Sequence, residues 1–246
     1  MTKRLVKPTA RRTTRRPGRP TGDSATQETI LDIAELEFAA RGYAGTALRE
    51  IAERADVNQA LINYYFGSKQ KLFEEVFKRR GLHITRRRME LLTELERQNP
   101  VPNLRSLLQA FITPPFEMKD QGPGGLAFMR LQARLHFEPE ELAIKLRREV
   151  YDLSTKRYVK AIIRALPKAD PADIYWRTTF MIGAQLYMLS GLYRLEDISD
   201  GQYKGASLSD EVIDRMVMFM EHGMQAPSSA KTKPAANSQS RPRREK

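Results

Sequence analysis

Residues 56–69, DVNQALINYYFGSK, place the amides of Gln59 and Asn63 and two phenols on a segment whose pattern predicts a helix of about two turns. Gln59 and Asn63 lie four residues apart, so they share one face of that helix. A helix fits the major groove of DNA, where Asn and Gln can pair with adenine edges and apolar groups contact the thymine methyl. Tyrosine hydroxyls, and Lys69 at the start of the next helix, can reach phosphates, which fix register without carrying sequence information.

The residues before this segment predict the helices that must hold it in place. An apolar stripe over 30–38 predicts a first helix that stops at Gly42 in a left-handed conformation, with Tyr43 as an apolar contact. Thr46 is a good N-cap for a second helix, and Asn58 can cap the short third one. Gly67 and Ser68 then end the third helix and cap a long one over 69–98. The side chains expected to pack between these helices are Ile30, Ala34, Phe38, Leu48, Ile51, Ala52, Val57, Ile62 and Phe66.

The rest of the chain also shows helical patterns, and we find no convincing strand, hairpin or internal repeat. The predicted class is all-α, with an N-terminal three-helix head that contains a helix-turn-helix and a C-terminal helical bundle. The bundle helices are expected near 103–117, 124–136, 139–166, 171–194 and 208–223, separated by Pro and Gly stretches. The predicted domains are a disordered basic arm (1–22), the head (23–83, with the helix-turn-helix at about 46–66), the bundle (84–225) and a disordered basic tail (226–246).

The charge of the 246-residue chain is concentrated at its two ends. The formal net charge is +12; residues 1–22 hold eight basic residues and no acid, and residues 227–246 hold six basic residues and one acid. These ends either keep the protein in solution or grip a polyanion such as nucleic acid. The chain has no cysteine, no apolar signal core and no apolar run long enough to cross a bilayer, so we expect a cytoplasmic protein with no membrane association.

We do not expect an enzyme, a metal site or a cofactor. His83, His136 and His222 lie far apart and have no carboxylates at metal-ligand spacing. The glycines at 122–125 lack the Lys and Ser or Thr that complete a phosphate-binding loop, so a helix connection is the simpler interpretation.

Residues 29–77, TILDIAELEFAARGYAGTALREIAERADVNQALINYYFGSKQKLFEEVF, resemble the DNA-binding head of the tetracycline-repressor (TetR) family. The specific matches are the ILD, A-E-F and RGY letters of the first helix, the LREIAERA segment and the closing NYYFGSK and KLF. The resemblance implies an all-helical homodimer that binds a palindromic double-stranded DNA operator, usually as a repressor released by a small-molecule effector. An activator is the alternative within regulation, and a non-specific nucleic-acid-coating protein is the alternative from another class.

The resemblance also assigns roles within the head. It implies phosphate contacts by Thr46, Lys69, Tyr64 and Tyr65, and base reading by the exposed face of the third helix. Asp56 stands where the family usually has Gly, and we expect the turn to survive because Asp tolerates the left-handed conformation. The complete set of DNA-binding candidates is Thr46, Arg49, Gln59, Ala60, Asn63, Tyr64, Tyr65 and Lys69, together with Arg15, Arg16 and Arg19 of the arm. The three arm arginines either enter a minor groove, where A·T tracts concentrate negative potential, or attract phosphates non-specifically.

Aromatic and Met residues recur along the bundle helices, where most of them are expected in the core. In the TetR family the corresponding bundle encloses an effector pocket, and such side chains suit an adaptable apolar cavity. Arg130, Arg134 and His136 are candidates to meet an anionic head group there. Helices 171–194 and 208–223 are expected to form the homodimer interface. The expected pocket residues are Phe111, Phe128, Arg134, Trp176 and Phe180.

Overall fold

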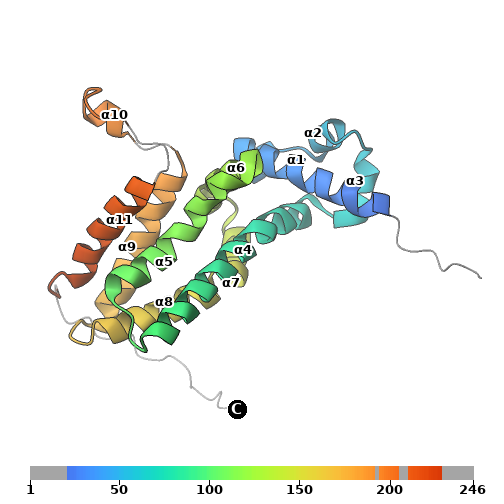
Figure 1. Cartoon of the computed structure of the whole chain (residues 1–246). Coiled ribbons are helices and arrows are strands. Elements are labelled where there is room, and N and C mark those ends of the chain that lie inside the picture. The colour runs from blue at the N-terminus through green and yellow to red at the C-terminus, as the bar shows by residue number, and fades with distance from the viewer. Residues whose placement is uncertain (1–20, 192–193, 205–209, 229–246) are drawn as a thin grey trace, which may run out of the picture.

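The computed structural model describes residues 21–191, 194–204 and 210–228, and the regular structure in these ranges is entirely helical, which confirms the predicted class. A head lies at one end of an elongated molecule, and a long helix runs from it into a bundle (Figure 1). The head helices are α1 (Thr21–Gly45), α2 (Leu48–Arg54) and α3 (Gln59–Phe66), and the long helix is α4 (Lys69–Gln98).

The bundle packs around the distal half of α4. Helices α9 and α11 lie side by side at the edge farthest from the head, while the short α10 stands apart (Figure 1). The bundle elements are α5 (Leu104–Phe116), η1 (Glu117–Gln121), α6 (Gly122–Arg134), η2 (Leu135–Phe137), α7 (Glu140–Val150), α8 (Asp152–Ala165), α9 (Pro171–Leu189), α10 (Leu195–Ile198) and α11 (Asp210–Gln225).

The head is held by a small core between α1, α2, α3 and α4. The ring centroids of Phe38 and Phe73 are 4.9 Å apart in an edge-to-face arrangement, and the Tyr43 ring contacts Phe73 at 5.5 Å. Helix α1 kinks at Gly42, whose φ of 74° is accessible to glycine without a steric cost. The predicted stop at Gly42 is therefore a kink, after which one more turn of helix leads to Gly45. The fully buried side chains of this core are Ile30, Ala34, Phe38, Ile51, Ile62, Leu72 and Phe73.

Polar contacts join the head to the bundle at two points. The buried Glu35 of α1 accepts hydrogen bonds from Arg80 at 2.6 Å and Arg79 at 3.2 Å on α4. Beyond the kink of α1, both carboxylate oxygens of Glu138 accept the Tyr43 main-chain N–H at 3.1 Å. Because Glu138 follows η2 directly, the end of α1 is tied to the segment that continues α6.

Two predicted helix boundaries are wrong. The single helix expected over 139–166 is two helices, α7 and α8, which meet at Tyr151. The reason is tertiary: the Tyr151 ring packs against Phe77 of α4, and the chain passes so close to Gly81 that a Cβ there would lie 2.6 Å from Val150. Helix α9 ends at Leu189 instead of 194, because a turn follows in which Gly191 has a φ of 72°.

Candidate functional site

The two helices of the motif predicted at 46–66 are joined by a tight, hydrogen-bonded turn. Asp56 adopts the left-handed conformation expected of it, with a φ of 53°, and the Val57 N–H donates to the Ala52 carbonyl at 3.0 Å. The Asn58 side chain accepts the Leu61 N–H at 2.8 Å, which confirms the predicted cap of α3. The apolar side of α3 turns inward through Ile62, which is fully buried, so the orientation of α3 is fixed by the core.

The opposite face of α3 presents the predicted polar set to solvent. Gln59, Ala60, Asn63 and Tyr64 are all exposed, Tyr64 to 81%. Within the described ranges, the side-chain amides of Gln59 and Asn63 form no hydrogen bond with the protein. Their donors and acceptors are therefore available to a partner, on a helix short enough to enter a major groove.

Thr46 does not cap α2, so that prediction is wrong. Ala47 occupies the N-cap position, and Thr46 is 2% exposed. The Thr46 hydroxyl donates to the Gly42 carbonyl at 2.8 Å and lies 3.2 Å from the Glu37 carbonyl, so in this structure it holds the loop after the kink. Its one proton is directed at main-chain carbonyls in this structure.

The structure separates the other phosphate-binding candidates. The Tyr65 hydroxyl donates to the Asp23 carboxylate at 3.1 Å, whereas the Tyr64 hydroxyl has no hydrogen-bond partner among the described residues. The Lys69 ammonium lies 4.7 Å from the Tyr43 ring centroid and 3.4 Å from the Ala44 carbonyl, at the N-terminus of α4, where the helix dipole also favours an anion. Arg49 is exposed and pairs with Glu53 at 2.7 Å. Arg15, Arg16 and Arg19 lie outside the described residues.

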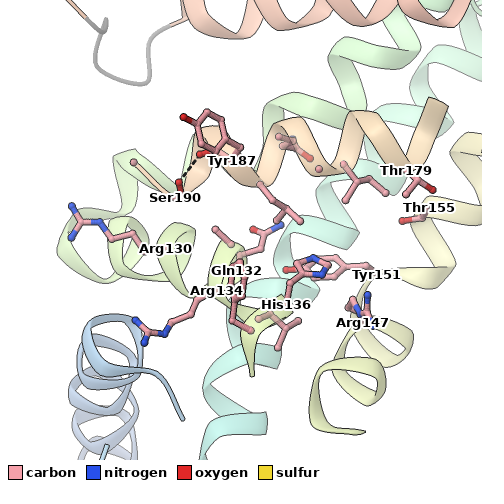
Figure 2. Close-up of a pocket in the computed structure, with 18 of the residues that line it drawn as sticks. Arg130, Gln132, Arg134, His136, Arg147, Tyr151, Thr155, Thr179, Tyr187 and Ser190 are labelled. Carbon is pink, nitrogen blue, oxygen red and sulfur yellow. Dashed lines mark hydrogen bonds between the residues drawn. The ribbon is translucent and has the colours of Figure 1, made fainter. Parts of the chain in front are cut away.

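A cleft of about 1170 Å³ opens in the bundle, between η2 and the helices α1, α4, α5, α6, α7, α8 and α9. Figure 2 shows Gln132, Arg134 and His136 along one wall, with Tyr187 and Ser190 of α9 on the opposite side. Burial and the nearby Arg147 guanidinium lower the pKa of His136, so its ring is neutral at pH 7. The apolar part of the lining includes Phe111, Ala133, Leu135, Ile182 and Leu186.

Head and bundle each match a family model. The model for bacterial regulatory proteins of the tetR family matches residues 30–76, and the model for the tetracyclin repressor-like C-terminal domain matches residues 109–223. The chain belongs to the TetR family. The family models thus cover both the head with its helix-turn-helix and the bundle with its cleft, and the earlier resemblance is confirmed.

Curated relatives match part of this TetR-family chain. It is 44% identical over 52 residues to the probable HTH-type transcriptional regulator YttP of Bacillus subtilis, covering 21% of this chain and 25% of YttP. It is 34% identical over 87 residues to the HTH-type transcriptional repressor NicS of Pseudomonas putida, covering 35% of this chain and 40% of NicS. The aligned segments thus span less than half the length of these relatives.

Solved structures extend the likeness of the fold over most of the TetR-family chain. A TetR-family transcriptional regulator from Bordetella parapertussis superposes with a TM-score of 0.60 at 17% identity, covering 83% of this chain and 98% of that one. HlyIIR, a hemolysin II transcriptional regulator, superposes with a TM-score of 0.55 at 24% identity, covering 80% and 97%. At these identities the superpositions show a shared architecture of head and bundle.

The structure brings only part of the predicted pocket set together at the cleft. Phe111 and Arg134 line the cleft, whereas Phe128 is fully buried in the core, where its ring lies 5.4 Å from that of Phe77. Trp176 and Phe180 are 58% and 65% exposed on the outside of α9, with their rings stacked 6.1 Å apart. Sequence pattern marks these residues as apolar, but which surface of a helix faces a cavity depends on the helices packed around it.

Sequence reasoning missed the most buried charge in the cleft, Arg88 of α4. Arg88 is 3% exposed, and it lies four residues from Ile84 and four from Leu92, both fully buried. That spacing places it on the apolar stripe of α4, a signal that was available in the sequence but hidden within the run Arg86–Arg88. Gln132, Arg147 and Tyr151 were missed as well, and no local pattern marks them. In the described part of the chain, no cluster of His, Asp and Glu is arranged to hold a metal ion.

Proposed function

We propose that this TetR-family chain is a sequence-specific DNA-binding transcriptional regulator that acts on a palindromic operator. The observation that carries the proposal is the exposed face of α3, where Gln59, Ala60 and Asn63 stand free beside Tyr64 on a helix oriented by its buried Ile62. Base reading by this face, with Tyr64 and Lys69 on phosphates, gives the free amides of Gln59 and Asn63 and the exposed Tyr64 hydroxyl a partner. The arm residues Arg15, Arg16 and Arg19 and the exposed Arg49 add positive charge near the duplex.

The regulator acts as a homodimer through α9 and α11. Exposed aromatic side chains follow one side of α9, and α11 beside it exposes Met218 to 48% and Phe219 to 71%. Contiguous apolar surface of this kind is uncommon on a monomer, and a two-fold axis here would bury it in a four-helix interface. Met216 and Met220 of α11 are buried within the chain's own core. The exposed α9 side chains are Tyr175, Trp176, Phe180 and Tyr187.

The cleft serves as the site of a small-molecule effector that releases the operator. It is large enough for a drug-sized molecule, and its wall residue Arg134 lies next to the contacts that hold the end of α1. A ligand that displaces Arg134 thereby disturbs the support of the reading head. We place this regulator in the cytoplasm with its DNA and assign it no enzymatic activity. Within the described ranges, no helix is both long and apolar enough to cross a bilayer.

Selection of bound fragments from random duplex DNA, with the full chain at physiological salt, tests the proposal. A palindromic motif is the expected result, because two symmetric copies of α3 would read symmetric half-sites. Uniform recovery of all fragments would overturn the proposal and favour a protein that coats nucleic acid through its basic ends.

A further inference from the structure

Five arginines in the described part of the chain have no carboxylate partner, and three of these five line the cleft. Most arginines of this region have a carboxylate within 4 Å, as in the pairs Arg79–Asp32 and Arg157–Glu96. Arg88, Arg130 and Arg147 form no such pair with a described residue, and all three line the cleft. The lining acid Asp152 pairs with Lys156 at 2.9 Å, so it does not neutralise them.

Arg88 is the costliest of these charges to leave without a counter-ion. It is 3% exposed and donates only to neutral acceptors, the Phe111 carbonyl at 2.8 Å and the Gln185 side-chain oxygen at 3.2 Å. Its guanidinium carbon lies 3.7 Å from the centroid of the Phe111 ring. Burial lowers the pKa of Arg88 to about 10, so the group still carries its charge at pH 7. A buried charge of this kind is destabilising unless it is compensated.

Two further polar groups of the lining have no partner. The side-chain oxygen of Gln132, a residue that is 5% exposed, and the Tyr151 hydroxyl are both buried and accept or donate no hydrogen bond within the described ranges. The Tyr151 phenol lies close enough to Arg88 for the two groups to interact electrostatically, while Arg147 flanks Tyr151 and His136 (Figure 2). A cation, a phenol and an amide therefore line the same cleft, whose apolar lining includes Phe111, Ile182 and Leu186.

We propose that the effector of this regulator is a small organic anion with an apolar body. Its anionic group binds between Arg88, Tyr151 and Arg147, and its body packs against Phe111, Ile182 and Leu186. A carboxylate, sulfonate or phosphate accepts several charge-assisted hydrogen bonds at once, which supplies the counter-charge that the cleft lacks. The inference rests on the proposed function only in treating the cleft as the effector site.

A purely structural role for Arg88 is the competing explanation. Its hydrogen bonds to Phe111 and Gln185 join α4 to α5 and α9, and such a staple needs no ligand. Arg147 separates the two explanations, because its side chain donates to the Ala143 carbonyl of its own helix at 3.3 Å. Loss of Arg147 therefore removes charge from the cleft without breaking a hydrogen bond between described helices.

A matched pair of dyes tests the proposal in the absence of DNA. The probes are 8-anilinonaphthalene-1-sulfonate and N-phenyl-1-naphthylamine, which share the same apolar body but differ in the sulfonate. Fluorescence titration of the full chain should show one sulfonate dye per chain in the cleft, bound at least roughly tenfold more tightly than the neutral dye. Equal affinities, or no saturable binding of the sulfonate dye, would overturn the proposal.

Three variants assign the preference to the cleft. Arg147→Gln should weaken the sulfonate dye roughly tenfold and leave the neutral dye unchanged, and Arg88→Met should weaken it more. Arg148→Gln, an exposed neighbour on α7 outside the lining, should change neither dye and serves as the control. If Arg88→Met does not fold, as judged by circular dichroism, the effect of Arg147→Gln on the sulfonate dye still tests whether the anion binds in the cleft. Loss of both dyes alike, or an effect of Arg148→Gln as large as that of Arg147→Gln, would contradict an anion site. Because no DNA is present, failure here is distinguishable from failure of the operator selection.

Discussion

Replacement of Asn63 by Ala separates base reading from folding more cleanly than any other change in the head. Asn63 is exposed on α3, and its side chain has no partner among the described residues. Removing it should therefore change the free energy of unfolding by no more than about 0.5 kcal/mol, the usual range for an exposed position. Any large loss of operator affinity must then come from contacts with DNA.

The expected loss of operator affinity follows from one Asn63 amide in each of the two symmetric half-sites. A side chain that forms two hydrogen bonds with a base edge contributes about 1–3 kcal/mol of discrimination. A symmetric dimer presents Asn63 to both half-sites, so Asn63→Ala should cost about 2–6 kcal/mol, which is roughly a 30-fold to 10⁴-fold loss of affinity. Preference should relax at one symmetric pair of base positions and stay unchanged elsewhere.

Asn58→Ala provides the control, because it removes the same side chain five residues away. The Asn58 side chain accepts the Leu61 N–H at 2.8 Å, so its loss should cost about 1 kcal/mol of stability through the cap of α3. Fluorescence anisotropy with the selected duplex and its single-base variants measures both proteins at one salt concentration. An unchanged motif and affinity for Asn63→Ala, or an equal loss on every duplex, would refute the assignment of Asn63 to base reading.

Four further changes test other parts of the account. Lys69→Ala should weaken binding to all sequences alike and reduce the slope of log affinity against log salt by about one unit for each lost phosphate contact. Deletion of residues 1–20 should leave the unfolding midpoint unchanged, lower the affinity for every duplex and make that affinity less dependent on salt. A larger loss of affinity for operators with A·T flanks than for operators with G·C flanks would indicate that the arm enters the minor groove. No loss of affinity would mean that the arm serves solubility. Sedimentation at micromolar concentration should give a dimer for the natural chain and a monomer for Phe180→Asp, since a charge would be buried in the α9 interface; a monomeric natural chain would contradict that interface. Glu138→Ala should lower the free energy of unfolding, measured in urea, by about 2–4 kcal/mol, because the Tyr43 N–H and Arg134 lose their acceptor. A change near zero would contradict the conclusion that Glu138 links head and bundle.

The head could be predicted from the sequence because its determinants are local. Asn58 and Ser68 each accept a main-chain N–H three residues onward, and Asp56 supplies the left-handed turn between α2 and α3. The period of α3 then fixes which face carries Gln59 and Asn63 once Ile62 is buried. Thr46 is the exception, since the kink at Gly42 brings its hydroxyl to main-chain carbonyls instead of to the end of α2.

The bundle could be predicted as a set of helices but not as a site. The break at Tyr151 arises from packing against α4, which lies about seventy residues earlier in the chain. Trp176 and Phe180 are aromatic, as pocket residues often are, yet which surface of α9 faces the cleft depends on the helices packed around it. Arg88 is part of a basic run in the sequence, and only its place on the buried stripe of α4 shows that it belongs to the cleft.

The spacing of half-sites tests the central claim most directly, namely that two copies of α3 read DNA from one fixed dimer. The selected operator is compared with a duplex of the same half-sites separated by an additional half helical turn, about 5 base pairs, which moves the second half-site to the opposite side of the duplex. Affinity for the altered duplex should fall to that for random DNA at the same salt concentration, while the natural spacing retains tight binding by one dimer. Equal affinity for the two duplexes would contradict the account, because it would mean that the heads bind independently of the α9 and α11 interface.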